Sequence, residues 1–140
     1  PIELEGTYPL PEAQLDRFIF KILVDSPSQS ELKEILERTT GSATQEIRPL
    51  FSPEETTSKI LSMRNLARSV IIAPPLEDVL VGIIFALTPG NPHATKLTNE
   101  YVRFGPGPRG AQSVLLAAKV LALLDNRVNV AYEDIRSAIA

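Results

Sequence analysis

Arg109 is the residue of this sequence whose position best suits the binding of an anion. It follows Gly105-Pro106-Gly107-Pro108 and precedes a stretch rich in alanine and leucine, a pattern that predicts a helix beginning at Pro108. A cation in the first helical turn faces the positive end of the helix dipole, at a cost of about 0.3–1 kcal/mol. A bound phosphate would offset this cost, because free N–H groups and an arginine fork both bind phosphate oxygens. On charge placement alone, a surface arginine that points to water is the favoured explanation.

Arg17 is a second candidate, because it lies where a short helical stretch meets an apolar segment. From the neighbouring residues alone, a local ion pair with Asp16 or Glu12 is the simpler explanation for this arginine. The sequence pattern by itself therefore assigns Arg17 no chemical role.

The remaining ionisable residues form no recognisable catalytic or metal-binding pattern. Glu3, Glu5 and Asp16 are carboxylates close together in the sequence, but their spacing matches no ligand set and favours a solvated loop. His93 is the single histidine, and cysteine is absent, so we expect no metal site. The sequence has no G-x-x-x-x-G-K-[ST] motif, so independent ATP binding by this chain is not expected.

The segment that follows Arg17 differs in character from the rest of the chain. Residues 18–24 are rich in β-branched and aromatic side chains and predict a strand. Both faces of this strand are apolar apart from Lys21, as in a central strand that helices cover on each side. No other segment supplies the neighbouring strands of such a sheet, which indicates a fragment of a larger α/β fold.

After Pro27 the sequence predicts a bundle of four to five helices. Capping-box spacing at Ser28 and at Ser52 marks the first two helix starts. The last short helix follows Ala131, a poor capping residue. A short extended piece at 47–51 is a candidate to pair with residues 128–130. The expected helices cover about residues 30–38, 53–73, 76–87, 108–125 and 132 onward.

Composition narrows the classes of function that the chain can have. With 140 residues, of which 44% are hydrophobic, it is long enough for an ordinary globular domain. A net charge of −3 argues against a nucleic-acid or anionic-membrane surface. The longest apolar run, Val79–Leu87, is far shorter than the roughly 20 residues of a membrane-spanning helix. No secretory signal is recognisable. We therefore expect a cytoplasmic protein without membrane insertion.

Two stretches of the sequence resemble the MoxR family of AAA+ ATPases. The first is EGTYPLPEAQLDRF at residues 5–18, and the second is VRFGPGPRGAQSVLLAAKVLALLDNR at residues 102–127. The second is similar to the family's sensor 2 segment, a Gly-x-x-Pro-Arg pattern followed by an alanine- and leucine-rich helix. Ala131 departs from the family, in which Ser or Thr is usual at this position.

The resemblance implies a fold and two functional residues. Residues 1–25 would be the end of an AAA+ α/β core, with a helix and its last strand, and residues 26–140 an all-helical lid. The fold class expected is thus mainly α. Arg17 takes the position of the catalytic arginine finger, and Arg109 that of the sensor 2 arginine, which contacts ATP phosphate.

The resemblance also implies an activity for the intact protein, which would hydrolyse ATP with Mg²⁺ to remodel or mature partner proteins. Its partners would be neighbouring subunits of a ring, a hexamer, and a von Willebrand factor A domain protein. The present chain lacks the Walker A and Walker B motifs and should be inactive alone. Two alternatives stay open: a magnesium-chelatase-like ATPase subunit and a nucleotide-independent helical interaction module.

Overall fold

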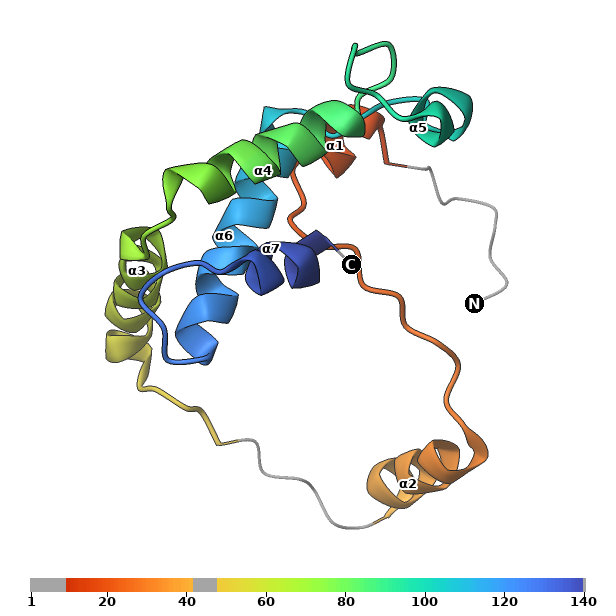
Figure 1. Cartoon of the computed structure of the whole chain (residues 1–140). Helices are drawn as coiled ribbons and strands as arrows, with labels where there is room; N and C mark the ends of the chain where they lie inside the picture. Colours follow the sequence, from red (N-terminus) through yellow and green to blue (C-terminus); the bar gives the residue numbers. More distant parts are fainter. Residues whose placement is uncertain (1–9, 42–47, 140) are drawn as a thin grey trace. The chain divides into compact units, whose positions relative to one another are not determined.

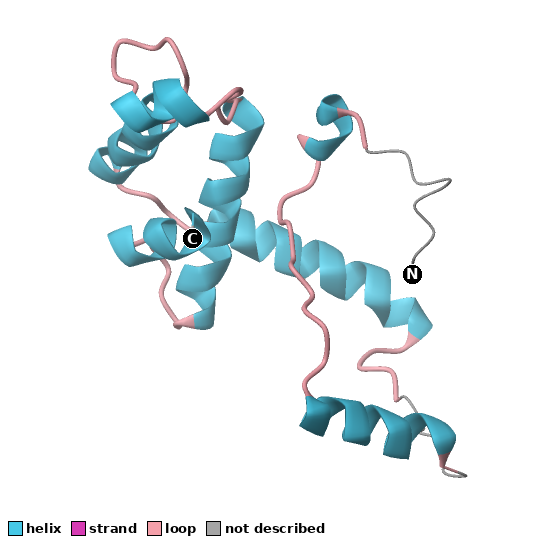
Figure 2. Ribbon diagram, turned by 90° about the vertical axis from the view of Figure 1, so that its right-hand side faces the viewer, coloured by secondary structure: helices cyan, strands magenta, loops and turns pink. Residues whose placement is uncertain are grey.

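The computed structural model describes residues 10–41 and 48–139, and throughout these ranges the regular elements are helices (Figure 2). The expected mainly helical fold class is confirmed. The chain divides into two compact units, one of residues 1–19 and 62–140 and the other of residues 20–61. The predicted domain boundary between residues 25 and 26 stays a prediction. Glu3 and Glu5 lie outside the described residues.

The unit of residues 20–61 contains α2 (Gln29–Thr40) and the first turns of α3 (Pro53–Ser69). The predicted capping box of α2 is confirmed: the Glu31 N–H donates to Ser28 Oγ at 3.3 Å, and the Ser28 N–H donates to Glu31 Oε2 at 2.7 Å. The predicted cap of α3 is also confirmed, since Ser52 Oγ accepts from the Glu55 N–H at 3.3 Å. Local sequence chemistry therefore fixes both helix starts.

The strand predicted for residues 18–24 is wrong as secondary structure. These residues form neither helix nor strand, and their apolar side chains are largely exposed, with Ile22 at 80% and Val24 at 89%. A strand is held by hydrogen bonds to a neighbouring strand. The described part of the chain supplies no such neighbour. The β-forming composition of this segment is therefore not sufficient to make it a strand.

The larger unit contains α1 (Glu12–Leu15), the end of α3, α4 (Pro74–Ala86), α5 (Lys96–Tyr101), α6 (Pro108–Leu124) and α7 (Tyr132–Ile139). Both α4 and α7 pack against α6 (Figure 1). The small side chains of Ala118 and Ala122, both fully buried, allow these neighbours to approach α6 closely. The other buried residues of this core are Val70, Leu80, Val130 and Ile135.

The segment after α6 pairs with a different partner from the one expected. The Ile71 N–H donates to Val128 O at 3.1 Å, and the Val130 N–H donates to Ile71 O at 2.8 Å, forming an isolated parallel bridge. The expected pairing of residues 128–130 with residues 47–51 is therefore wrong for the described residues. Because Val70 and Val130 are buried in the same core, their neighbouring backbones are brought side by side.

An arginine clamp fixes the loop between α6 and α7. Arg127 donates from Nη1 to Asp134 Oδ2 at 2.8 Å and from Nη2 to Asp134 Oδ1 at 2.7 Å. The hydrogen bonds from Arg127 hold the pKa of the buried Asp134 carboxyl below its ordinary value. Asp134 Oδ2 also accepts from the Ala131 N–H at 2.7 Å. Asp134 thereby satisfies the backbone at the start of α7, where Ala131 offers no capping side chain.

Helix α5 was not among the expected helices, because its sequence KLTNEY has no apolar periodicity. Two threonines fix it: Thr95 Oγ1 accepts from the Thr98 N–H at 3.0 Å, and the buried Thr98 hydroxyl donates to Ala86 O at 2.8 Å. The second bond ties α5 to the end of α4. None of the helices in the described ranges is long and apolar enough to cross a membrane.

Candidate functional site

Arg109 is the second residue of α6, in the first helical turn as predicted. The cap residue Gly107 offers no side-chain acceptor, the first residue is a proline without an N–H, and the first turn carries no acidic residue. Within the described ranges, no group accepts a hydrogen bond from the N–H of Arg109 or Gly110. The positive end of a helix of 17 residues therefore presents two N–H donors and a guanidinium.

Glycines hold the loop before α6 against its neighbours. A Cβ atom added to Gly105 would lie 2.6 Å from Leu87 O and 2.6 Å from Thr88 Cα, so this loop runs directly over the end of α4. A Cβ atom on Gly110 would lie 2.8 Å from Pro106 Cβ. Glycine at these two positions permits the close packing that sets where α6 begins, and hence where Arg109 lies.

Arg109 is paired with a carboxylate that lies far from it in the sequence. Its Nε lies 3.6 Å from Oδ2 of Asp16, in the turn that directly follows α1. Both side chains are about half exposed, at 56% for Arg109 and 51% for Asp16. The contact lies within the larger unit, and it brings the start of α6 to the turn that carries Arg17.

Arg17 is exposed, and its backbone N–H donates to Gln14 O at 3.1 Å in the turn that ends α1. Among the described side chains Arg17 makes no ion pair, and Asp16 pairs with Arg109 instead. The local ion pair between Arg17 and Asp16, one alternative from the sequence, is therefore not formed; the side chain of Glu12 is outside the described set. The Arg17 guanidinium is accessible to a partner.

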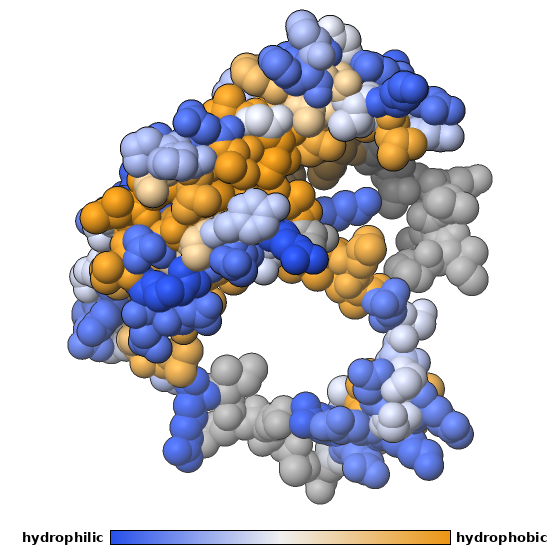
Figure 3. All heavy atoms as spheres, viewed as in Figure 1, coloured by the Kyte–Doolittle hydropathy of each residue, from blue (hydrophilic) through white to orange (hydrophobic). Residues whose placement is uncertain are grey.

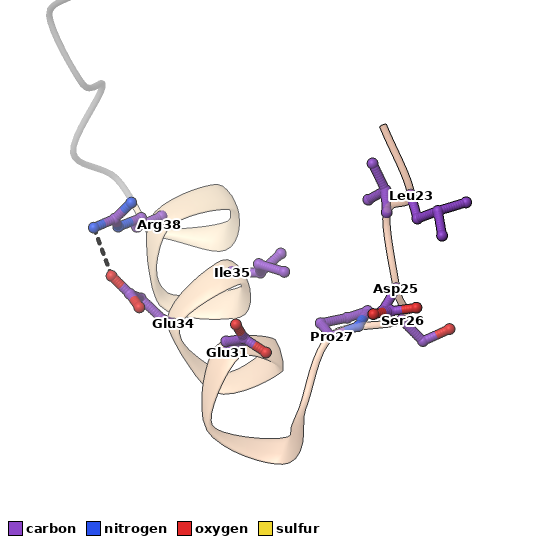
Figure 4. A pocket seen from close by; sticks show the side chains of 9 residues that line it. Leu23, Asp25, Ser26, Pro27, Glu31, Glu34, Ile35 and Arg38 are labelled. Carbon is purple, nitrogen blue, oxygen red and sulfur yellow. Dashed lines mark ion pairs between the residues drawn. The ribbon is translucent and has the colours of Figure 1, made fainter. Parts of the chain in front are cut away.

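Among the hollows in the described part of the chain, two are relevant to the site. One, of about 410 Å³, lies between α4 and the loop before α6, and its lining is mostly apolar. Figure 3 shows apolar side chains gathered over α4, where Val81 and Phe85 are about half exposed. The other, of about 630 Å³, lies in the smaller unit between residues 23–27 and α2 (Figure 4), where Glu34 pairs with Arg38. Neither hollow includes Arg17 or Arg109.

The geometry brings together parts that the sequence keeps 93 positions apart. The contact between Arg109 and Asp16 brings the first turn of α6, with its two N–H donors, to the turn that carries Arg17. Arginine and N–H donors suit the oxygens of a polyphosphate. The sequence indicated both arginines, but not that Asp16 contacts Arg109. No local pattern could have predicted that contact, because it depends on how α1 packs. Among the described residues no cluster of three or more metal-binding side chains occurs.

Comparisons with known proteins give a consistent result. Residues 94–140, which include α5, α6 and α7, match the AAA lid domain family. The chain is 35% identical to Chaperone MoxR1 of Mycobacterium tuberculosis over 139 residues, which are 99% of this chain and 36% of that protein. It is 28% identical to Protein MoxR of Methylorubrum extorquens over 145 residues, covering 97% of this chain and 42% of that protein.

A solved structure has the same fold. The crystal structure of a "putative ATPase" from Cytophaga hutchinsonii matches with a TM-score of 0.81 and 30% sequence identity, covering 98% of this chain and 41% of that chain. The present chain thus spans about two fifths of the length of the proteins that it matches.

Proposed function

Because the chain belongs to the MoxR family of AAA+ ATPases, we propose that it is the sensor and lid portion of an ATPase that couples ATP hydrolysis to remodelling or maturation of partner proteins. The AAA lid match supports the lid assignment, and the similarity to a named chaperone supports the remodelling role. The proposed assembly is a cytoplasmic ring, a hexamer, and the resemblance adds a von Willebrand factor A domain protein as one partner.

The observation that carries this proposal is the contact between Arg109 and Asp16. It places the first turn of α6 beside the turn that carries Arg17, with Nε and Oδ2 3.6 Å apart. A triphosphate has several negatively charged oxygens, and arginine side chains and helix N–H groups are donors from which such oxygens accept. The residues present therefore fit the phosphate groups of ATP.

In this proposal the two arginines have different roles. Arg17 is the arginine finger, which stabilises the charge of the transferring phosphoryl group; such arginines are worth about 10³–10⁵ in rate, or roughly 4–7 kcal/mol. Arg109 is the sensor 2 residue, which contacts phosphate and reports its loss to the rigid α6. ATP with Mg²⁺ supplies the bond that is broken. The arginines bind and orient it.

The position of Arg109 also favours a particular subunit arrangement. An arginine finger can be supplied in trans to a nucleotide held by another chain, which in a ring would be the neighbouring subunit. Because Asp16 joins Arg109 to the turn of Arg17, both arginines belong to one surface of the same subunit. We propose that both act in trans, on the nucleotide held by the neighbour.

A mixing experiment in the intact ATPase tests this arrangement. Subunits with Arg17→Ala are mixed with subunits that cannot bind ATP, and subunits with Arg109→Ala are mixed in the same way. Each mixture contains interfaces that pair an intact nucleotide pocket with an arginine from the other variant. We expect both mixtures to regain ATPase activity, although each variant alone is inactive.

The outcomes separate the two assignments. Recovery with Arg17→Ala alone places Arg109 in cis and contradicts the shared surface. Recovery with neither, when mixed rings are shown to form by native mass spectrometry, rejects the arginine-finger role of Arg17. A conservative Arg109→Lys variant, which keeps the charge but loses the bidentate fork, should fall between wild type and Arg109→Ala.

A further inference from the structure

The start of α6 carries more positive charge than its own residues balance. The helix dipole and Arg109 add there, and the first turn of α6 contains no acidic residue. The carboxylate that approaches this end comes from elsewhere in the chain: Asp16, whose Oδ2 lies 3.6 Å from Arg109 Nε. Within the described residues, no other carboxylate lies within ion-pairing distance of Arg109.

The pair has the properties of an exchangeable contact. The distance of 3.6 Å is longer than the roughly 2.7–2.9 Å of a charge-assisted hydrogen bond. Both side chains are about half exposed, so solvent and ions reach them. In contrast, the Arg127–Asp134 pair of the same unit is bidentate, and its carboxylate is only 4% exposed. The geometry of Arg127 therefore favours a lasting ion pair with Asp134, whereas Arg109 can exchange Asp16 for another anion.

We propose that Asp16 is an internal competitor for phosphate: its carboxylate occupies Arg109 when no phosphate is bound and must leave before a phosphate group binds there. This rests on the proposed function, in which Arg109 is a phosphate-binding residue. A phosphate and the Asp16 carboxylate are both negative and need the same guanidinium, so they cannot both hold it. Asp16 therefore weakens phosphate binding at Arg109 and gives the nucleotide-free site a defined arrangement.

The expected size of the effect follows from the exposure of the pair. Half-exposed ion pairs hold their partners weakly, so removing the competitor should tighten phosphate binding about 1.5- to 5-fold.

The test uses the 140-residue chain and tripolyphosphate as the probe, at constant ionic strength. Nitrogen–proton correlation NMR follows the side-chain Nε–Hε signal of Arg109 in wild type and in Asp16→Asn. Asp25→Asn is the matched control, because it removes the same charge from an exposed residue of the other unit. Without tripolyphosphate, Asp16→Asn should move the Arg109 signal, and Asp25→Asn should not.

With tripolyphosphate, the dissociation constant in Asp16→Asn should be about 1.5- to 5-fold lower than in Asp25→Asn. In an Arg109→Ala background, where calorimetry replaces the Arg109 signal as the readout, Asp16→Asn should give no tightening beyond that of Asp25→Asn, which would show that Asp16 acts through Arg109. Equal constants in the two single variants, or weaker binding in Asp16→Asn, would overturn the competitor role while leaving Arg109 as a phosphate ligand. If the Arg109 signal ignores tripolyphosphate in every variant, and Arg109→Ala does not change binding, phosphate recognition itself is refuted.

Discussion

Replacement of Asp134 by asparagine is expected to destabilise the larger helical unit. The Asp134 side chain is 4% exposed and accepts three hydrogen bonds, two from the guanidinium of Arg127 and one from the Ala131 N–H. Asparagine has nearly the same shape, but it is neutral and its amide group presents N–H donors. One of the two contacts with Arg127 would then bring donor against donor.

The size of the expected loss in unfolding free energy follows from the burial of the Asp134 carboxylate and the partial exposure of Arg127. Breaking a fully buried ion pair costs about 3–5 kcal/mol. Here the Arg127 side chain is 31% exposed and keeps Asp125 and the Asn129 carbonyl as acceptors, so the loss is smaller. We expect Asp134→Asn to lower the free energy of unfolding by about 2–3 kcal/mol, nearer the 1.5–3 kcal/mol of a hydrogen bond to a charged group.

Urea unfolding followed by circular dichroism measures this loss. A change of this size should lower the urea midpoint by about 1 M or more. The effect also has a predicted pH dependence. Because the pKa of Asp134 is lowered in the folded chain, its stabilisation is fully present above the unfolded value of about 3.9. It is lost as the pH falls through the lower folded pKa. The difference between wild type and Asp134→Asn should therefore shrink in acid.

Glu133→Gln is the matched control, because it removes a carboxylate from the same turn of α7 at an exposed position. It should change the free energy of unfolding by less than about 0.5 kcal/mol. A loss below this limit for Asp134→Asn, or a loss that is unchanged in acid, would refute the reasoning that the clamp holds the loop between α6 and α7.

Three further predictions concern the phosphate site and the exposed segment. Gly105→Ala should destabilise the larger unit by about 1–3 kcal/mol in urea unfolding, because its Cβ would lie 2.6 Å from backbone atoms of Leu87 and Thr88. Gly107→Ala meets no atom within 4 Å, so an equal loss in both variants would contradict this explanation. The chain alone, which lacks the Walker A and Walker B motifs, should show no binding of ATP with Mg²⁺ by calorimetry at low micromolar concentration. A dissociation constant below about 10 µM would contradict the expectation that tight ATP binding needs those motifs. Deletion of residues 1–25 should leave a helical chain that is folded by circular dichroism and monomeric by sedimentation. The full chain should self-associate as its concentration rises, through its exposed apolar residues 18–24. Loss of the helical signal on deletion would disprove the predicted domain boundary.

Local sequence chemistry was enough to predict most of the helix starts. Ser28 and Ser52 cap the helices that their capping boxes predict, and Pro108 begins α6, so Arg109 lies in a first turn as expected. These features depend on residues within four positions of one another. Their stabilisation comes from local hydrogen bonds and does not depend on how the rest of the chain packs. Helix α5 was missed because its two threonines work through a carbonyl of α4, a contact between elements.

What the sequence by itself determined is most of the helices, the resemblance to an ATPase family and the two arginines that suit phosphate. The tertiary structure decided which of these groups meet: Val128 and Val130 pair with Ile71, Arg127 closes on Asp134, and Asp16 reaches Arg109. In the tertiary structure residues 18–24 do not form the predicted strand, because a strand needs a neighbouring strand to accept and donate its backbone hydrogen bonds. The pairing at Ile71 and the contact at Arg109 share one physical reason. A contact between distant residues depends on how buried helices pack, and that packing is a property of the whole core rather than of any local pattern.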